Sequence, residues 1–170
     1  MSKINSGRYT AMTDEDFVVF LIGMRVNRLL AIRKWWPVFQ AMPRMLIDLM
    51  RNPQKGYLGG RTLIGWRSVT MIQYWRSVDD LERFARNPDD PHWPAWKKFY
   101  QLVGSDGSVG IWHETYPVHG AQSENVYVNV PRLGLGEVVD LIPATGRRAS
   151  ARGHPSKTVP ISSKIEEVNP

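Results

Sequence analysis

The sequence contains no cysteine, which excludes disulfides, thiolate metal sites and a cysteine nucleophile. This absence is typical of proteins in the reducing cytosol, and we therefore expect a cytoplasmic protein. The sequence also lacks a long hydrophobic run, since the longest, from Phe17 to Met24, is far too short to cross a bilayer. Residues 1–16 are polar and lack the apolar centre of a signal peptide.

Several short catalytic and cofactor-binding motifs are missing as well. There is no Gly-rich phosphate loop, no dinucleotide-binding fingerprint, no HExxH and no GxSxG sequence. Nucleotide cofactors and serine chemistry are therefore not expected. A zinc site would have to be assembled from histidines and carboxylates that are scattered along the chain.

Aromatic residues, by contrast, are abundant: the chain has seven Trp, six Tyr and five Phe. Such rings fill hydrophobic cores and also line apolar ligand cavities. The length of 170 residues predicts one domain, which we place at residues 14–143, after a flexible N-terminus over 1–13. Residues 144–170 are basic and rich in Ser, Pro and Gly, and are expected to form a disordered tail. This tail has no aromatic-basic platform, so we expect no nucleic-acid partner.

The hydrophobic pattern predicts four main strands, at residues 17–26, 61–65, 67–75 and 109–118, with a further short strand at 125–130. A helical pattern over 28–36 is interrupted by Pro37, which suits the first turn of a new helix that ends at Asn52-Pro53. Ser77 and Asp80 resemble a capping box at the start of another helix. Asp90-Pro91 marks one more helix start.

The resulting order is strand, helix, strand, strand, helix, strand. This is the β-α-β-β-α-β arrangement of ferredoxin-like α+β folds. The helices cover one face of such a sheet and leave the other face bare. A second copy of the sheet would bury that face, so we expect a homodimer, a dimeric α+β barrel.

Four spaced motifs carry a resemblance to a known family: Ile22–Asn27 (IGMRVN), Gln73–Ser77 (QYWRS), Pro91–Trp96 (PHWPAW) and Val109–Tyr116 (VGIWHETY). Together they resemble a monooxygenase-like family of the dimeric α+β barrel superfamily, found in bacteria and in fungal secondary-metabolite clusters. The superfamily includes cofactor-free antibiotic-biosynthesis monooxygenases, haem-degrading oxygenases, haem-dependent dehydratases and proteins without known catalysis. The fold alone does not choose among these reactions.

The His113-Glu114 pair lies inside a predicted strand, where polar side chains need partners or a pocket. Because side chains alternate along a strand, the two residues must face opposite sides of the sheet. Whichever faces the cavity is the better catalytic candidate. His113 would serve there as a general base or as an axial haem ligand, and a purely architectural histidine is the alternative.

Two further catalytic candidates come from the resemblance. His92, near the start of its predicted helix, is similar in position to a haem-binding helix histidine of the haem-degrading branch. Asn27 resembles the strand asparagine that orients substrate or oxygen in cofactor-free monooxygenases. An exposed capping histidine and an ordinary strand-ending asparagine are the simpler interpretations.

A second set of residues is expected to bind the substrate. The tryptophans would wall a flat aromatic molecule or a porphyrin, although core packing is the simpler role for most of them. A guanidinium on a strand needs a carboxylate partner such as Glu114, or an anionic ligand group. The set comprises Arg67, Trp75, Trp96, Trp112 and Tyr116.

The resemblance and these residues imply oxygenation of a hydrophobic small molecule, aromatic or polyketide- or terpenoid-like. Without a cofactor, His113 or His92 would remove a proton from the substrate, and Asn27 with Arg67 would hold the developing oxyanion. One alternative is a haem enzyme of dehydratase or oxygenase type, with His113 or His92 bound to iron. Another is a small-molecule-binding protein without catalysis.

A basic-aromatic cluster follows the first predicted strand. Its position at the start of a helix would allow contact with a membrane surface. The sequence favours a dimer interface or a pocket rim for it instead, so membrane contact is not expected. The cluster comprises Arg28, Arg33, Lys34, Trp35 and Trp36.

Overall fold

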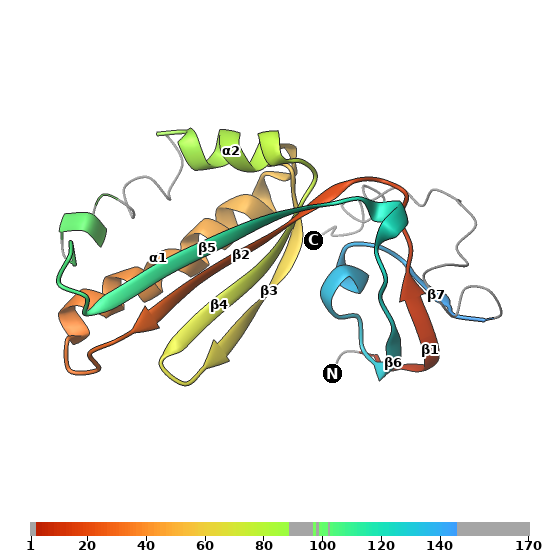
Figure 1. The fold of residues 1–170 in the computed structure, drawn as a ribbon, viewed down its shortest axis with the longest axis horizontal. Coiled ribbons are helices and arrows are strands. Elements are labelled where there is room, and N and C mark those ends of the chain that lie inside the picture. The colour runs from red at the N-terminus through yellow and green to blue at the C-terminus, as the bar shows by residue number, and fades with distance from the viewer. Residues whose placement is uncertain (1–2, 89–96, 98, 102, 146–170) are drawn as a thin grey trace.

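A four-stranded antiparallel sheet backed by helices forms the centre of the fold (Figure 1). The computed structural model describes residues 3–88, 97, 99–101 and 103–145. The sheet has the order β3-β4-β2-β5, built from β2 (Phe17–Val26), β3 (Tyr57–Gly65), β4 (Ser68–Trp75) and β5 (Val109–Val118). Helix α1 (Ile32–Arg51) follows β2 and helix α2 (Val78–Arg86) follows β4. The ferredoxin-like α+β prediction is confirmed.

The two long central strands follow their sequence patterns closely. Both β2 and β5 have the bounds that the pattern predicted, and they pair antiparallel along their whole length. The hairpin of β3 and β4 begins earlier than expected, at Tyr57, and turns at Trp66-Arg67. Arg67 adopts a left-handed backbone with φ of 61°, which is uncommon for a residue with a Cβ.

Helix α1 corrects one prediction, because it continues unbroken through both Pro37 and Pro43. Each proline removes one i→i−4 hydrogen bond and strains the preceding turn. The apolar side of the helix nevertheless packs against the sheet, with Leu46 and Leu49 on one core cluster and Val38 on another. This tertiary packing outweighs the local break, so no new helix starts at Pro37.

Helix α2 begins as predicted. The Oγ of Ser77 accepts a hydrogen bond from the backbone N–H of Asp80 at 3.1 Å, which satisfies one of the free donors of the first turn. The helix predicted from Asp90-Pro91 starts outside the described residues, although residues 97 and 99–101 are helical.

A second, three-stranded sheet has the order β6-β1-β7, from β1 (Asn5–Ala11), β6 (Tyr127–Val130) and β7 (Leu141–Pro143). This sheet corrects the prediction of a flexible N-terminus over 1–13, since β1 is its central strand. It also adds a strand beyond residue 130, where the sequence pattern predicted none. The reason is that β1 is stabilised by partners more than a hundred residues away, which local patterns do not reveal.

Three apolar clusters hold these elements together. The first joins the two sheets and contains Phe17, Tyr74 and Val139. The second lies under α2, around the fully buried Trp75. The third closes the opposite end of the sheet, around Met24 and Val109.

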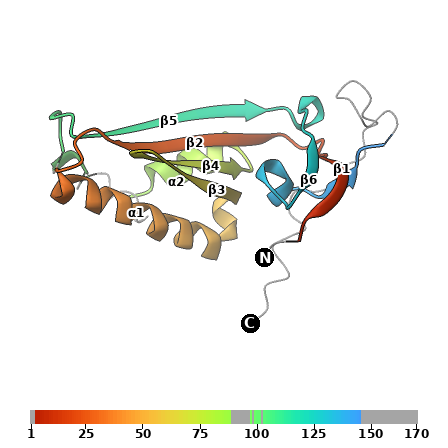
Figure 2. The ribbon, with the colours of Figure 1, turned by 90° about the horizontal axis from the view of Figure 1, so that it is seen from below.

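Short 3-10 turns complete the fold: η1 (Pro53–Lys55), η2 (Gly120–Gln122) and η3 (Gly134–Glu137). Within the described ranges, no helix combines the length and the apolar character needed to cross a membrane. Viewed from below, α1 runs beneath the sheet while β5 and β2 form the layer above it (Figure 2).

Candidate functional site

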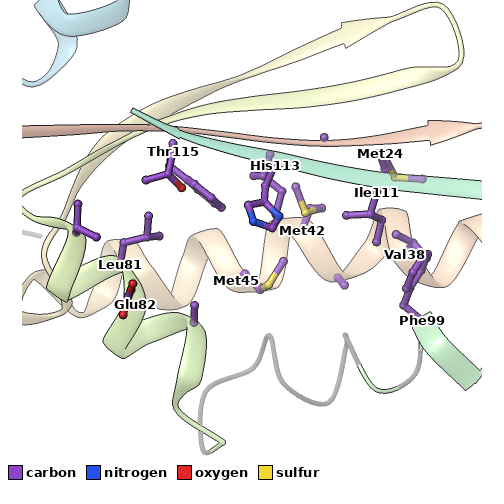
Figure 3. Close-up of a pocket in the computed structure, with 16 residues that line it drawn as sticks. Met24, Val38, Met42, Met45, Leu81, Glu82, Phe99, Ile111, His113 and Thr115 are labelled. Atoms are coloured by element: carbon purple, nitrogen blue, oxygen red, sulfur yellow. The ribbon is translucent and has the colours of Figure 1, made fainter. Parts of the chain in front are cut away.

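An apolar cavity of about 540 Å³ lies between the sheet and the helices (Figure 3). This volume falls within the range of small-molecule sites, roughly 300–1,000 Å³. Its walls come from β2, α1, α2 and β5, together with Phe99. The side chains in the close-up are mostly aliphatic, aromatic or thioether: Met24, Val38, Met42, Met45, Leu81, Phe99 and Ile111.

Helix α1 supplies the floor of the cavity because its apolar residues recur at helical spacing. Val38, Met42 and Met45 lie three or four residues apart and therefore share one face. Methionine is flexible and polarizable, so it adapts to ligands of different shape. This arrangement suits a hydrophobic molecule rather than a charged one.

Three polar side chains occur among the described lining residues: His113, Thr115 and Glu82. His113 projects from β5 into the cavity, toward Met42 (Figure 3). Its ring packs 5.8 Å from the ring of Phe20, centroid to centroid. The residues that the structure describes form no hydrogen bond with either imidazole nitrogen, so both nitrogens can interact with a ligand.

Thr115 lies two residues after His113 and on the same face of β5. In the strand register, His113 pairs with Ile22 and Thr115 with Phe20. Residues spaced by two on a strand lie about 7 Å apart, so one small molecule could contact both side chains. Glu82, on α2, forms an ion pair with Arg86 at 2.9 Å, in which both side chains are half exposed or more.

Glu114, Trp112 and Tyr116 lie on the opposite face of β5 and do not line the cavity. The Glu114 carboxylate accepts a hydrogen bond from the Tyr116 hydroxyl at 2.7 Å. The Trp112 indole covers Gly23, where a Cβ would lie 2.5 Å from Nε1. The predicted placement of His113 and Glu114 on opposite faces is thus observed, and the candidate site residues Glu114, Trp112 and Tyr116 lie on the face away from this cavity.

Asn27 and Arg67 lie at the end of β2, away from the cavity lining, and bond to main-chain groups. The Asn27 amide donates to the carbonyl of Gly107 at 3.0 Å. The Arg67 guanidinium donates to the carbonyls of Val26 and Asn27. They fix the hairpin turn and the loop before β5, so the expected pairing of these two residues around an oxyanion is corrected.

Trp75 is a core residue. It is fully buried between Tyr57 and Phe84, and its Nε1–H donates to the side-chain oxygen of Gln73 at 2.9 Å. His92 and Trp96 lie outside the described residues.

Sequence reasoning missed Thr115, Glu82 and the three methionines as lining residues. Thr115 had a usable signal, because it shares its strand face with His113. Met42 and Met45 recur at helical spacing in the sequence, which marks them only as one face of a helix. Nothing in the sequence indicated that this face borders a cavity rather than a filled core.

The described residues offer little to a metal or a haem. No group of three or more histidines and carboxylates among them could hold a metal ion. His113 could supply one nitrogen to iron, but the lining residues that the structure describes include no Arg or Lys to pair with porphyrin carboxylates. Among the described lining residues, only His113 would therefore bind a haem, and it would do so through the iron.

Comparisons with known proteins agree with this geometry. The sequence model of a family described as Monooxygenase af470-like matches residues 17–135. The chain is 32% identical over 136 residues to Monooxygenase af470 of Aspergillus fumigatus, covering 71% of this chain and 46% of that protein. The chain thus spans about half the length of this curated relative.

Among solved structures, the fold is similar to that of an aldoxime dehydratase (OxdRE) crystallised with butyraldoxime, with a TM-score of 0.59 and 18% identity. That similarity covers 78% of this chain and 40% of the dehydratase. A weaker match is SnoaB, a cofactor-independent oxygenase from Streptomyces nogalater, with a TM-score of 0.42 and 18% identity over 59% of this chain and 91% of SnoaB.

Proposed function

Since the chain belongs to the Monooxygenase af470-like family, we propose that it oxygenates a hydrophobic small molecule held between the sheet and the helices. The observation that carries the proposal is the His113 imidazole, which projects into an apolar cavity of ligand size. His113 is an exposed polar residue of this otherwise apolar wall, so its imidazole is accessible to a ligand. The described lining residues include no cation, which favours an uncharged substrate of aromatic, polyketide-like or terpenoid-like character.

The reaction needs a substrate whose C–H bond is acidified by neighbouring carbonyl or aromatic groups. His113 removes that proton as a general base, and the carbanion transfers electrons to dioxygen as a C–O bond forms. The proton on His113 then completes a hydroperoxide. Loss of water from the hydroperoxide leaves a carbonyl, so that CH₂ and O₂ become C=O and H₂O, and the substrate itself is the only reductant.

Thr115 has the oxyanion-stabilising role that the sequence suggested for Asn27 and Arg67. Its hydroxyl is the hydrogen-bond donor next to His113 on the cavity face of β5. A hydrogen-bond donor at this place would stabilise the oxyanion that develops when the substrate is deprotonated. Met42, Met45 and Leu81 supply the apolar surface around it.

The test of this proposal is a pair of substitutions on neighbouring residues of one strand. His113→Ala should lower product formation and oxygen uptake by roughly 10²- to 10⁴-fold, the usual contribution of a general base. Glu114→Gln is the matched control, since its side chain lies on the other face of the sheet. If His113→Ala turns over at the wild-type rate, the histidine has no part in the chemistry.

A haem enzyme is the second candidate, because the free nitrogens of His113 could bind iron. The purified chain would then carry a Soret band that disappears in His113→Ala. Colourless protein that consumes oxygen with its substrate would support the cofactor-free reaction. Ligand binding without oxygen uptake or haem would support a non-catalytic binding protein instead.

We also propose that the chain functions as a homodimer through the face of the sheet that the helices leave open. Trp112 and Tyr116 support this proposal, since they remain 38% and 49% exposed on that face. Leu63 of β3 is exposed on the same side. A second sheet laid against these side chains would remove them from water and stabilise the pair of subunits.

A further inference from the structure

The connection between β2 and α1 and the β3–β4 hairpin lie at the end of the sheet that points away from β1, β6 and β7 (Figure 1), and both expose large apolar side chains. We call this set of side chains the tip. It consists of Leu29, Leu30, Ile32 and Trp36, from the connection between β2 and α1 and the first turns of α1, and of Ile64 and Trp66 from the β3–β4 hairpin. Leu30, Trp66 and Ile64 are 96%, 85% and 81% exposed. Exposure this complete is unusual for several large apolar side chains on two neighbouring segments.

The two segments of the tip are bonded to each other. The backbone N–H of Val26 donates to the carbonyl of Arg67 at 2.7 Å, and the Arg67 side chain returns bonds to Val26 and Asn27. The Trp35 indole N–H donates to the carbonyl of Leu29 at 3.0 Å. These hydrogen bonds fix the backbone that carries the apolar side chains. Binding of a partner therefore does not have to order this backbone.

Positive charge surrounds the tip. Within residues 25–36, 64–67 and 103–110 the cations are Arg25, Arg28, Arg33, Lys34 and Arg67, and Asp106 is the only acidic residue. Asp106 is ion-paired with Lys34, and hydrogen bonds from Lys34 and Ser108 lower its pKa. No described residue pairs with Arg25, Arg28 or Arg33. These segments, with five cations and one carboxylate, carry a net charge of +4.

From this juxtaposition of exposed apolar side chains and unpaired arginines, we propose that the tip docks on an anionic lipid surface. Leucine, isoleucine and tryptophan enter the boundary between headgroups and acyl chains, while arginines bind the lipid phosphates and carboxylates. Anionic lipid complements the charge of the tip. A second copy of the tip would not, because it would bring two sets of like charges together. The six apolar residues of the tip are distinct from Trp112, Tyr116 and Leu63 of the open face proposed for the dimer, while Arg25 lies on that face by strand register.

The proposal departs from the expectation that the basic-aromatic cluster is a dimer interface or a pocket rim. We make this change because the two most exposed apolar side chains, Leu30 and Trp66, are not members of the cluster that the sequence indicated. Membrane docking is also independent of the proposed reaction, since no tip residue lines the cavity.

Sedimentation of the full chain with lipid vesicles tests the proposal. The protein should pellet with vesicles of phosphatidylcholine plus phosphatidylserine and stay in solution with phosphatidylcholine alone. The double variant Leu30→Ser, Trp66→Ser should bind at least about tenfold more weakly, because both side chains lose their apolar burial. Removing Arg28 and Arg33 should weaken binding by roughly fivefold per cation, and high salt should do the same.

Matched controls come from the far end of α1. Met50→Ser replaces a side chain that is 62% exposed, and Arg44→Ala removes an exposed cation, both away from the tip. Neither should change vesicle binding. The proposal is overturned if the wild-type chain does not pellet, if it binds neutral vesicles equally well, or if the control variants weaken binding as much as the tip variants do. It is also overturned if the tip variants change the mass of the protein in solution without changing vesicle binding.

Discussion

Asp80 is a buried carboxylate whose neighbours hold the first turn of α2 in place. Its oxygens accept hydrogen bonds from Arg76 Nε at 2.7 Å and from Arg83 Nη1 at 2.8 Å. Burial alone would raise the pKa of Asp80, but the hydrogen bonds and charge of Arg76, with further bonds from Arg83 and Ser77, bring it below its usual value. The charged form is therefore favoured by folding, and it fixes the helix that brings Leu81 to the cavity.

Asp80→Asn should lower the free energy of unfolding by about 1–3 kcal/mol at neutral pH, since charge-assisted hydrogen bonds to two arginines are weakened. A lowered pKa gives stability that is present above about pH 4 and is lost as the pH falls through the folded-state pKa. The difference between the wild-type chain and the variant should therefore shrink below pH 4. Urea unfolding at pH 7 and pH 3 measures this, with exposed Asp79→Asn as the control. Equal stability of the two variants at pH 7 would contradict the assignment.

The sequence predicted the orientation of some site residues but not the contacts of others. Strand alternation put His113 and Glu114 on opposite faces of the sheet, and the structure places them there. Asn27 and Arg67 could not be placed in this way. Their roles depend on a hairpin turn with a left-handed Arg67, and strand propensity carries no information about turn contacts.

At the scale of elements, Asn125 connects β1 to the segment before β6. Its amide N–H donates to the carbonyl of Ala11 at 2.8 Å, while its amide oxygen accepts from the backbone N–H of Ala11 at 2.6 Å. The side chain thus pairs with β1 as a neighbouring strand would. Thr10 adds a bond from its hydroxyl to the Asn125 carbonyl at 2.9 Å.

Asn125→Ala should lower the free energy of unfolding by about 2–3 kcal/mol, because the backbone N–H and carbonyl of the buried Ala11 lose these two hydrogen bonds. Gln122→Ala, at an exposed position of η2, is the matched control and should change stability by less than about 0.5 kcal/mol. Hydrogen exchange should in addition show faster exchange of the Ala11 amide. Slow exchange at that amide in Asn125→Ala would mean that β1 is held by its strand neighbours alone.

Elements with strong internal patterns were predicted well, and those stabilised from outside were not. The apolar run of β2 and the capping residue of α2 specify those elements locally. In α1 two prolines argue for interruption, yet packing against the sheet keeps one helix. In β1 the sequence NSGRYTA is mostly polar, and only its distant partners make it a strand.

At the scale of the whole molecule, the sheet separates two surfaces with different uses. The helix side encloses the cavity, and the opposite side carries Trp112, Tyr116 and Leu63. The end of this open side nearest the second sheet is covered, because Leu135 and Val138 pack there with Tyr74. The bare face predicted from the element order is thus smaller than the sequence suggested.

Trp112→Arg together with Tyr116→Arg should convert a dimer into monomers, since four like charges would meet across the interface. Light scattering coupled to size exclusion should give the mass of one chain for this variant and of two for the wild type. Val128→Arg, which places the same charge on an exposed residue of β6, should leave the dimer intact. A wild-type chain that already has the mass of a monomer would remove the basis for the dimer.

The two extremes of the described chain meet in the second sheet. Strand β7 lies antiparallel to β1, with Pro143 opposite Tyr9, and the backbone N–H of Ala144 donates to the carbonyl of Arg8 at 2.9 Å. A short peptide could join residue 145 to the start of β1, and the ring could be reopened at an exposed loop. Such a circular permutant would keep every strand pairing, because the architecture depends on which strands are neighbours and not on which one is translated first.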